Sequence, residues 1–159
     1  MLEKLSKVMT SIIESFCGIV VVGQAVIIAE QVIARGLGIS LPWGEELARF
    51  FLIWLTFLGC SMAIKQDCHL SVDFFVRMAP QKIRLIIGLI VKFLMILFFG
   101  IILVYGVKLS VATMSTLSTS LQWPMGLIYF VLPVSAVISI FYIVLHTVGF
   151  IKKGKEGEV

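Results

Sequence analysis

The sequence predicts an all-α integral membrane protein with four transmembrane helices, and two observations support this prediction. Hydrophobic residues make up 60% of the 159 positions, whereas charged residues make up only 14%. A soluble domain carries about a quarter charged residues, so this chain lacks the polar side chains that would cover a surface in water. Its apolar runs are continuous and do not alternate with polar residues, which favours helices over the strands of an outer-membrane barrel.

The first two transmembrane helices are expected at residues 8–34 and 43–65. At 1.5 Å per residue the first would be roughly 40 Å long, so it should tilt or protrude from the hydrocarbon core. Pro42 stands just before the first turn of the second helix, where its fixed φ is favourable. Glu45 and Glu46 follow in that turn, where the helix dipole stabilises negative charge.

The other two transmembrane helices are expected at residues 83–109 and 123–149. Pro133 should kink the last one, because its ring clashes with the carbonyl group of Tyr129. Between the second and third helices, residues 70–79 predict a short amphipathic helix lying in the membrane interface. Four apolar residues would form its lipid-facing side: Leu70, Phe74, Phe75 and Met78.

The distribution of basic residues predicts that both termini are cytoplasmic, because loops rich in Lys and Arg remain on that side. With four helices, nine basic residues fall on one side and three on the other. The chain shows no internal repeat and no second domain, so residues 1–159 are expected to form one membrane domain. The nine are Lys4, Lys7, Lys65, Arg77, Lys82, Arg84, Lys152, Lys153 and Lys155, and the three are Arg35, Arg49 and Lys108.

The start of the second helix holds a group of charged residues, Glu45, Glu46 and Arg49. Either acid can pair with the arginine on one helix face, because they are four and three residues away from it. An arginine at the membrane boundary is costly unless it is paired or reaches the interface. The group therefore either anchors the helix in the interface or forms a polar clamp that reaches a partner helix.

A protein-facing side is predicted further along the same helix. Trp54 lies five residues beyond Arg49, too deep for an ordinary interfacial aromatic belt, and its indole N–H needs an acceptor. Gly59 and Ala63 are four residues apart and would allow another helix to approach closely. Such small pairs also arise by chance in apolar sequence.

Motifs for catalysis, cofactor binding and nucleic-acid binding are missing from the sequence. It contains no P-loop, no HExxH and no nucleophile elbow. Cys17, Cys60 and Cys68 lack metal or disulfide spacing. No basic face with interleaved aromatic residues suggests nucleic-acid binding. The sequence thus predicts no catalytic residue, no metal, no cofactor and no enzyme activity.

Two other functions are compatible with single residues. Glu14 could serve as the coupling carboxylate of a self-sufficient, homo-oligomeric four-helix antiporter, since acids within a membrane are functional candidates. His69 and His146 could be axial haem ligands on separate helices, although no flanking pattern supports a haem site.

The order of residues in the second helix and after it resembles the signature of a known family. That family is the small membrane subunit of the tripartite ATP-independent periplasmic (TRAP) transporters of the bacterial inner membrane. The resemblance covers the interface candidates of the second helix together with a cytoplasmic motif of Lys65, His69 and Asp73. In sequence order the matching residues are Glu45-Glu46-Leu47-Ala48-Arg49, Trp54, Gly59, Ala63, Lys65 and His69-Leu70-Ser71-Val72-Asp73.

The resemblance implies a three-part transporter. A periplasmic binding protein would deliver an organic anion, such as a C4-dicarboxylate, sialic acid or a related carboxylate. A large membrane subunit would hold the substrate and sodium sites and move by an elevator-type mechanism. The small subunit would be a fixed scaffold that braces the large one, and the interfacial helix would broaden its footprint on membrane lipid.

Overall fold

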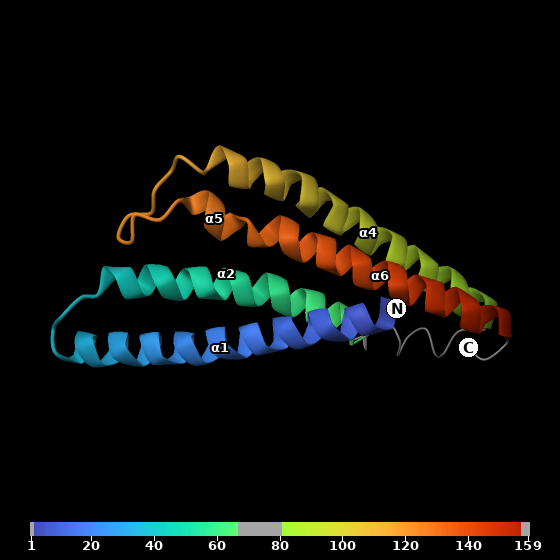
Figure 1. Ribbon diagram of the computed structural model, residues 1–159, viewed down its shortest axis with the longest axis horizontal. Helices are drawn as coiled ribbons and strands as arrows, with labels where there is room; N and C mark the ends of the chain where they lie inside the picture. The colour runs from blue at the N-terminus through green and yellow to red at the C-terminus, as the bar shows by residue number, and fades with distance from the viewer. Residues whose placement is uncertain (1, 67–80, 157–159) are drawn as a thin grey trace.

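The computed structural model describes residues 2–66 and 81–156, and four of its helices are long and apolar enough to cross a membrane (Figure 1). The predicted all-α membrane fold with four spans is therefore confirmed. The four candidate spans cover Val8–Gly36, Pro42–Lys65, Ile86–Ala112 and Met125–Thr147. The helices are α1 (Leu2–Gly36), α2 (Pro42–Lys65), α4 (Gln81–Ala112), α5 (Met125–Tyr129) and α6 (Val131–Glu156).

The predicted kink in the last span is present as a break between α5 and α6. Pro133 has no N–H to donate to the carbonyl of Tyr129, and the helix is interrupted at Phe130, between these two residues. The Phe130 N–H still donates to the Gly126 carbonyl at 3.0 Å, and the Val134 N–H to the Phe130 carbonyl at 3.4 Å, so helical hydrogen bonds continue on both sides of the break. The predicted interfacial helix at 70–79 lies outside the described residues.

The helices form a row in the order α1, α2, α6, α4 (Figure 1), because α6 packs on both α2 and α4 while α1 packs on α2. Within the most apolar stretch of each span, 44% of residues are buried in α5–α6 and 28% in α2. The corresponding shares are 11% in α1 and 6% in α4. The inner pair is thus more covered than the outer helices, which leave most of their apolar surface open.

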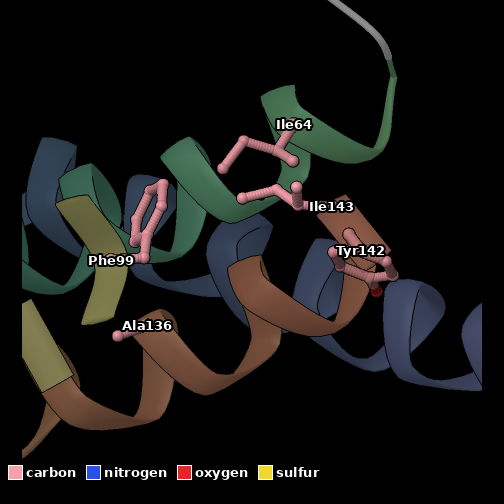
Figure 2. Close-up of a cluster of buried hydrophobic side chains, with 5 residues drawn as sticks. All are labelled: Ile64, Phe99, Ala136, Tyr142 and Ile143. Atoms are coloured by element: carbon pink, nitrogen blue, oxygen red, sulfur yellow. The ribbon is translucent and has the colours of Figure 1, made fainter. Parts of the chain in front are cut away.

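Two apolar clusters join the row. The first brings α2, α4 and α6 together and is shown in Figure 2. The second joins α1 and α2 to the start of α6, through Ile13, Leu58, Met62 and Val131. Each outer helix is therefore attached to the inner pair by its own cluster. The buried members of the first cluster are Ile64, Phe99, Ala136, Tyr142 and Ile143.

Polar contacts inside the row join its helices. The Ser61 hydroxyl on α2 is 2.9 Å from the Ser139 hydroxyl and 3.1 Å from the Ser135 carbonyl oxygen on α6. All three serines are fully buried. Thr10 on α1 similarly shares a hydrogen bond of 3.1 Å with the Tyr142 hydroxyl on α6. Such bonds between membrane helices contribute about 0.6–2 kcal/mol each.

Two glycines allow α4 to pack closely against the last span. A β-carbon on Gly126 would overlap the backbone carbonyl oxygen of Ser110. A β-carbon on Gly106 would lie 3.0 Å from the β-carbon of Leu132 and 3.1 Å from the ring of Pro133. Both positions therefore need a residue without a side chain if the helices are to keep this separation.

Candidate subunit interface

The two acids at the start of α2 bind different parts of the chain. Glu45 Oε1 accepts a hydrogen bond of 2.9 Å from the guanidinium of Arg35, which links the end of α1 to the start of α2. Both side chains are mostly exposed, so this ion pair contributes little to stability. The predicted pairing of either acid with Arg49 is wrong, because each carboxylate has a partner outside α2.

Glu46 holds the loop between α4 and α5. Its two carboxylate oxygens accept hydrogen bonds from three successive backbone N–H groups, those of Thr119, Ser120 and Leu121, at 3.0, 2.9 and 2.9 Å. Successive N–H groups of this kind form a concave anion-binding site. A side chain more than 70 residues earlier in the sequence thus fixes the tip of this loop to α2.

The loop is itself an ordered turn. Ser118 and Trp123 exchange two bonds: the Ser118 N–H donates to the Trp123 carbonyl at 2.9 Å, and the Ser118 hydroxyl accepts from the Trp123 N–H at 3.2 Å. Gln122 has a positive φ of 55°, and its side-chain amide donates to the carbonyls of Ser118 and Thr119. The Glu46 contact therefore binds a loop that has its own internal bonds.

Arg49 pairs with neither acid. Its side chain is exposed, and it makes no hydrogen bond or ion pair with any residue in the described ranges 2–66 and 81–156. Arg49 lies inside the candidate span Pro42–Lys65. A charge in this position is costly in a membrane unless it is paired or its side chain reaches the interface.

Trp54 lies in an apolar groove between α1, α2 and the α5–α6 region. Its ring packs against Phe16 with 5.7 Å between the ring centres. The groove has a volume of about 230 Å3 and also contains Leu58, Phe130 and Val134. The indole N–H has no hydrogen-bond acceptor among the residues that the structure describes. Trp54 is thus a packing residue within this chain, at the floor of an open groove.

Gly59 and Ala63 lie on the other side of α2. At 3.6 residues per turn, Trp54 is roughly 140° around the helix from Gly59 and about 180° from Ala63. Both small residues are exposed, and a β-carbon on Gly59 would meet nothing within 4 Å. The sequence placed Trp54, Gly59 and Ala63 on one protein-facing side. The structure divides them between a groove and an open face.

The remaining predicted residues are only partly described. Lys65 is half-buried at the last position of α2. The other two members of the cytoplasmic motif, His69 and Asp73, lie outside the described residues. The same holds for the four residues predicted to face lipid, namely Leu70, Phe74, Phe75 and Met78.

The antiporter and haem hypotheses depend on three residues, and the structure describes two of them. Glu14 is exposed on α1. His146 is half-buried on α6, and its backbone carbonyl accepts a hydrogen bond of 3.1 Å from the Lys92 ammonium on α4. His69 is not described. Within the described ranges no three His, Cys, Asp or Glu side chains gather closely enough to hold a metal ion.

Sequence reasoning missed the contacts that join helices far apart in the chain. Two such contacts are the bonds of Ser61 to α6 and the bond between Thr10 and Tyr142. The available signal was a hydroxyl residue within an otherwise apolar run.

Fold and site together define a multi-pass membrane subunit whose helices leave broad apolar faces uncovered. Residues 24–153 match the family model of the DctQ component of the tripartite ATP-independent periplasmic transporters. The chain belongs to this family, and it is a small TRAP transporter permease subunit of the inner membrane.

Three relatives illustrate the similarity. The chain is 31% identical to the sialic acid TRAP transporter small permease protein SiaQ of Vibrio cholerae, over 62% of this chain and 57% of that protein. It is 26% identical to the C4-dicarboxylate TRAP transporter small permease protein DctQ of Rhodobacter capsulatus, over 74% and 53%. It is also 29% identical to the sialic acid TRAP transporter permease protein SiaT of Haemophilus influenzae, over 82% and 21%.

The matched part of this chain spans little more than half the length of the two small permease relatives. In SiaT it corresponds to about a fifth of the protein. That relative therefore carries a segment similar to this chain within a polypeptide several times longer.

Proposed function

We propose that this chain is the scaffold subunit of a TRAP transporter, and that it binds and braces a large membrane subunit. The observation that carries the proposal is the open row of helices: only 6% of the most apolar stretch of α4 and 11% of that of α1 are buried. Membership of the DctQ family supports it. The long relative SiaT, with a similar segment in a larger permease, supports a stable association between the two parts.

The transported substrate is an organic anion delivered by a periplasmic binding protein. Relatives named for sialic acid and C4-dicarboxylate transport support this substrate class. We further propose that sodium drives uptake, and that the sodium and substrate sites belong to the large subunit, which moves while the small subunit stays fixed. In this arrangement the small subunit needs no catalytic group and has no enzyme activity.

We propose that both termini face the cytoplasm, as the nine-to-three distribution of basic residues indicates. The loop held by Glu46 then faces the periplasm, beside the entry route of the binding protein. Because this loop is ordered by its own bonds and by α2, it would present a constant surface there.

Reconstitution into liposomes tests the proposal against the self-sufficient antiporter. The small subunit alone should move neither sialic acid nor a C4-dicarboxylate. The small subunit, large subunit and binding protein together should take up one organic anion, and only with an inward sodium gradient. Uptake by the small subunit alone would favour the antiporter based on Glu14 and overturn the scaffold proposal. An absorption spectrum of the purified chain tests the haem hypothesis directly.

A further inference from the structure

One side of α2 forms a continuous exposed surface along the membrane-spanning part of the helix. Its members are spaced by three and four residues, which places them on one helix face, and each of them is exposed. From the first to the last they extend over roughly 21 Å at 1.5 Å per residue. We call this surface the open face of α2, and it consists of Arg49, Leu52, Thr56, Gly59 and Ala63.

The composition of the open face differs from that of the outer helices. Beyond Leu52 it carries a hydroxyl residue, a glycine and an alanine. By contrast, the exposed surface of α4 is built of large apolar side chains. Large apolar residues pack well against lipid tails, whereas small residues allow the backbone of another helix to approach closely. The large exposed residues of α4 include Phe93, Leu94, Leu97, Phe98 and Ile101.

The glycine on this face has no role inside the chain. Gly106 and Gly126 are required by the close packing of α4 against the last span, but a β-carbon on Gly59 would enter open space. A glycine within a helix costs about 1 kcal/mol relative to alanine. Another molecule could therefore approach the backbone closely at Gly59, where no side chain stands in the way.

The positive charge of Arg49, at one end of the open face, indicates the chemistry of the partner molecule. Two other basic residues are predicted on the same side of the membrane, and both have contacts: Arg35 pairs with Glu45, and the Lys108 ammonium lies 5.6 Å from the centre of the Tyr105 ring. Arg49 has no such contact among the described residues and lies seven residues into the span. A guanidinium binds the two oxygens of a carboxylate or a phosphate with paired hydrogen bonds, so Arg49 indicates an anionic group.

We infer that the open face of α2 is the contact surface for a transmembrane helix of the large subunit, and that this helix places an Asp or Glu carboxylate against Arg49. The inference rests on the proposed function and specifies where the two subunits meet. Lipid phosphate is the other anion that Arg49 can reach. The partner helix is favoured because the small residues continue from Arg49 into the depth of the membrane, where no phosphate is present.

Co-purification of tagged small subunit with the large subunit in detergent tests the inference. Arg49→Gln should weaken the association at least about tenfold, because the partner's carboxylate loses its counter-charge in a desolvated site. Gly59→Leu should weaken it to a similar extent by holding the partner helix away. Two matched controls, Lys108→Gln and Gly18→Leu, alter a basic residue on the same side and an exposed glycine with open space around it, and should retain the wild-type association.

A charge exchange makes the test specific. Arg49→Glu should lose association, and one Asp→Arg or Glu→Arg variant within a transmembrane helix of the large subunit should restore it. If Arg49→Gln and Gly59→Leu both keep wild-type association and uptake, the inference is wrong and Arg49 binds lipid phosphate. Failure of the wild-type chain to associate with the large subunit at all would instead overturn the proposed function.

Discussion

The inner and outer helices of the row differ in what holds them. The inner pair, α2 and α6, is joined by hydrogen bonds among Ser61, Ser135 and Ser139, all fully buried. The outer helix α4 is attached mainly by apolar contacts and by the close approach at Gly106 and Gly126, with one hydrogen bond from the Lys92 ammonium to the His146 carbonyl. The polar bonds fix which faces meet, whereas the apolar faces left outside are free to meet lipid or another subunit.

This difference explains how a small chain can have a defined structure and still leave broad apolar surfaces uncovered. In a membrane, apolar side chains provide little drive for helices to associate, because lipid tails are equally apolar. Specific hydrogen bonds and close backbone contacts must therefore set the arrangement. The following variants separate these two kinds of contact, beginning with the largest expected effect.

Gly126→Ala should cause the largest loss of stability. Its added methyl group overlaps the Ser110 carbonyl, so α4 and α5 must move apart at a cost of about 1–3 kcal/mol. Gly18→Ala on α1 is the matched control, since its methyl group meets nothing and alanine favours the helix. Thermal unfolding in detergent should show a lower midpoint for the first variant and an equal or higher one for the second. Equal midpoints would contradict the close contact.

Ser61→Ala should have the next largest effect, about 1 kcal/mol, because it removes the bonds to Ser139 and to the Ser135 carbonyl. Thr56→Val is the control on the open face of the same helix. The Thr56 hydroxyl bonds only the Leu52 carbonyl of its own helix, so its loss should leave the isolated subunit unchanged. Chemical unfolding of both variants in the absence of partners measures the difference. A larger effect from Thr56→Val would be inconsistent with the distinction between inner and open faces.

Glu46→Ala should act locally on the loop between α4 and α5. Without the carboxylate, the N–H groups of Thr119, Ser120 and Leu121 lose their shared acceptor, and their hydrogen exchange should accelerate. Glu45→Ala removes a neighbouring acid that does not touch this loop. Exchange measured by mass spectrometry should change in the loop for the first variant only. Unaltered exchange in Glu46→Ala would show that the loop's internal bonds suffice.

Arg35→Gln should have the smallest effect. The ion pair with Glu45 is 2.9 Å long but highly exposed, and such pairs contribute 0 to about 1 kcal/mol. The unfolding midpoint should stay within experimental error of the wild type. A clear drop would mean that the connection between α1 and α2 depends on this pair.

The sequence predicted the helices well because their signal is local. Long apolar runs ended by Pro42, Lys65 and the Gln122-Trp123-Pro124 segment were sufficient to place the four spans. The break next to Pro133 was also foreseen, since a missing N–H acts within one turn. These features depend on neighbours in sequence, and a single sequence contains that information.

The candidate interface was less predictable because its contacts join distant segments. Spacing along α2 suggested that Glu46 meets Arg49, but the loop at 119–121 offered three N–H donors and proved the stronger partner. Trp54 and Gly59 were assigned to one side because both suggested a protein contact. Their spacing of five residues already separates them by roughly 140° around the helix, and the positions of α1 and α6 around α2 determine what each side meets.

The last helix of the row to be synthesised is also the one that joins its two halves. The α1–α2 hairpin and α4 meet mainly through α6, which follows them in the chain. At typical synthesis rates the residues from Ala112 to Glu156 take roughly 2 to 9 seconds to emerge. During that interval Ser61 has no serine partner on α6, and the hairpin lies in the membrane with its inner side uncovered. The two halves of the subunit therefore join only after α6 inserts.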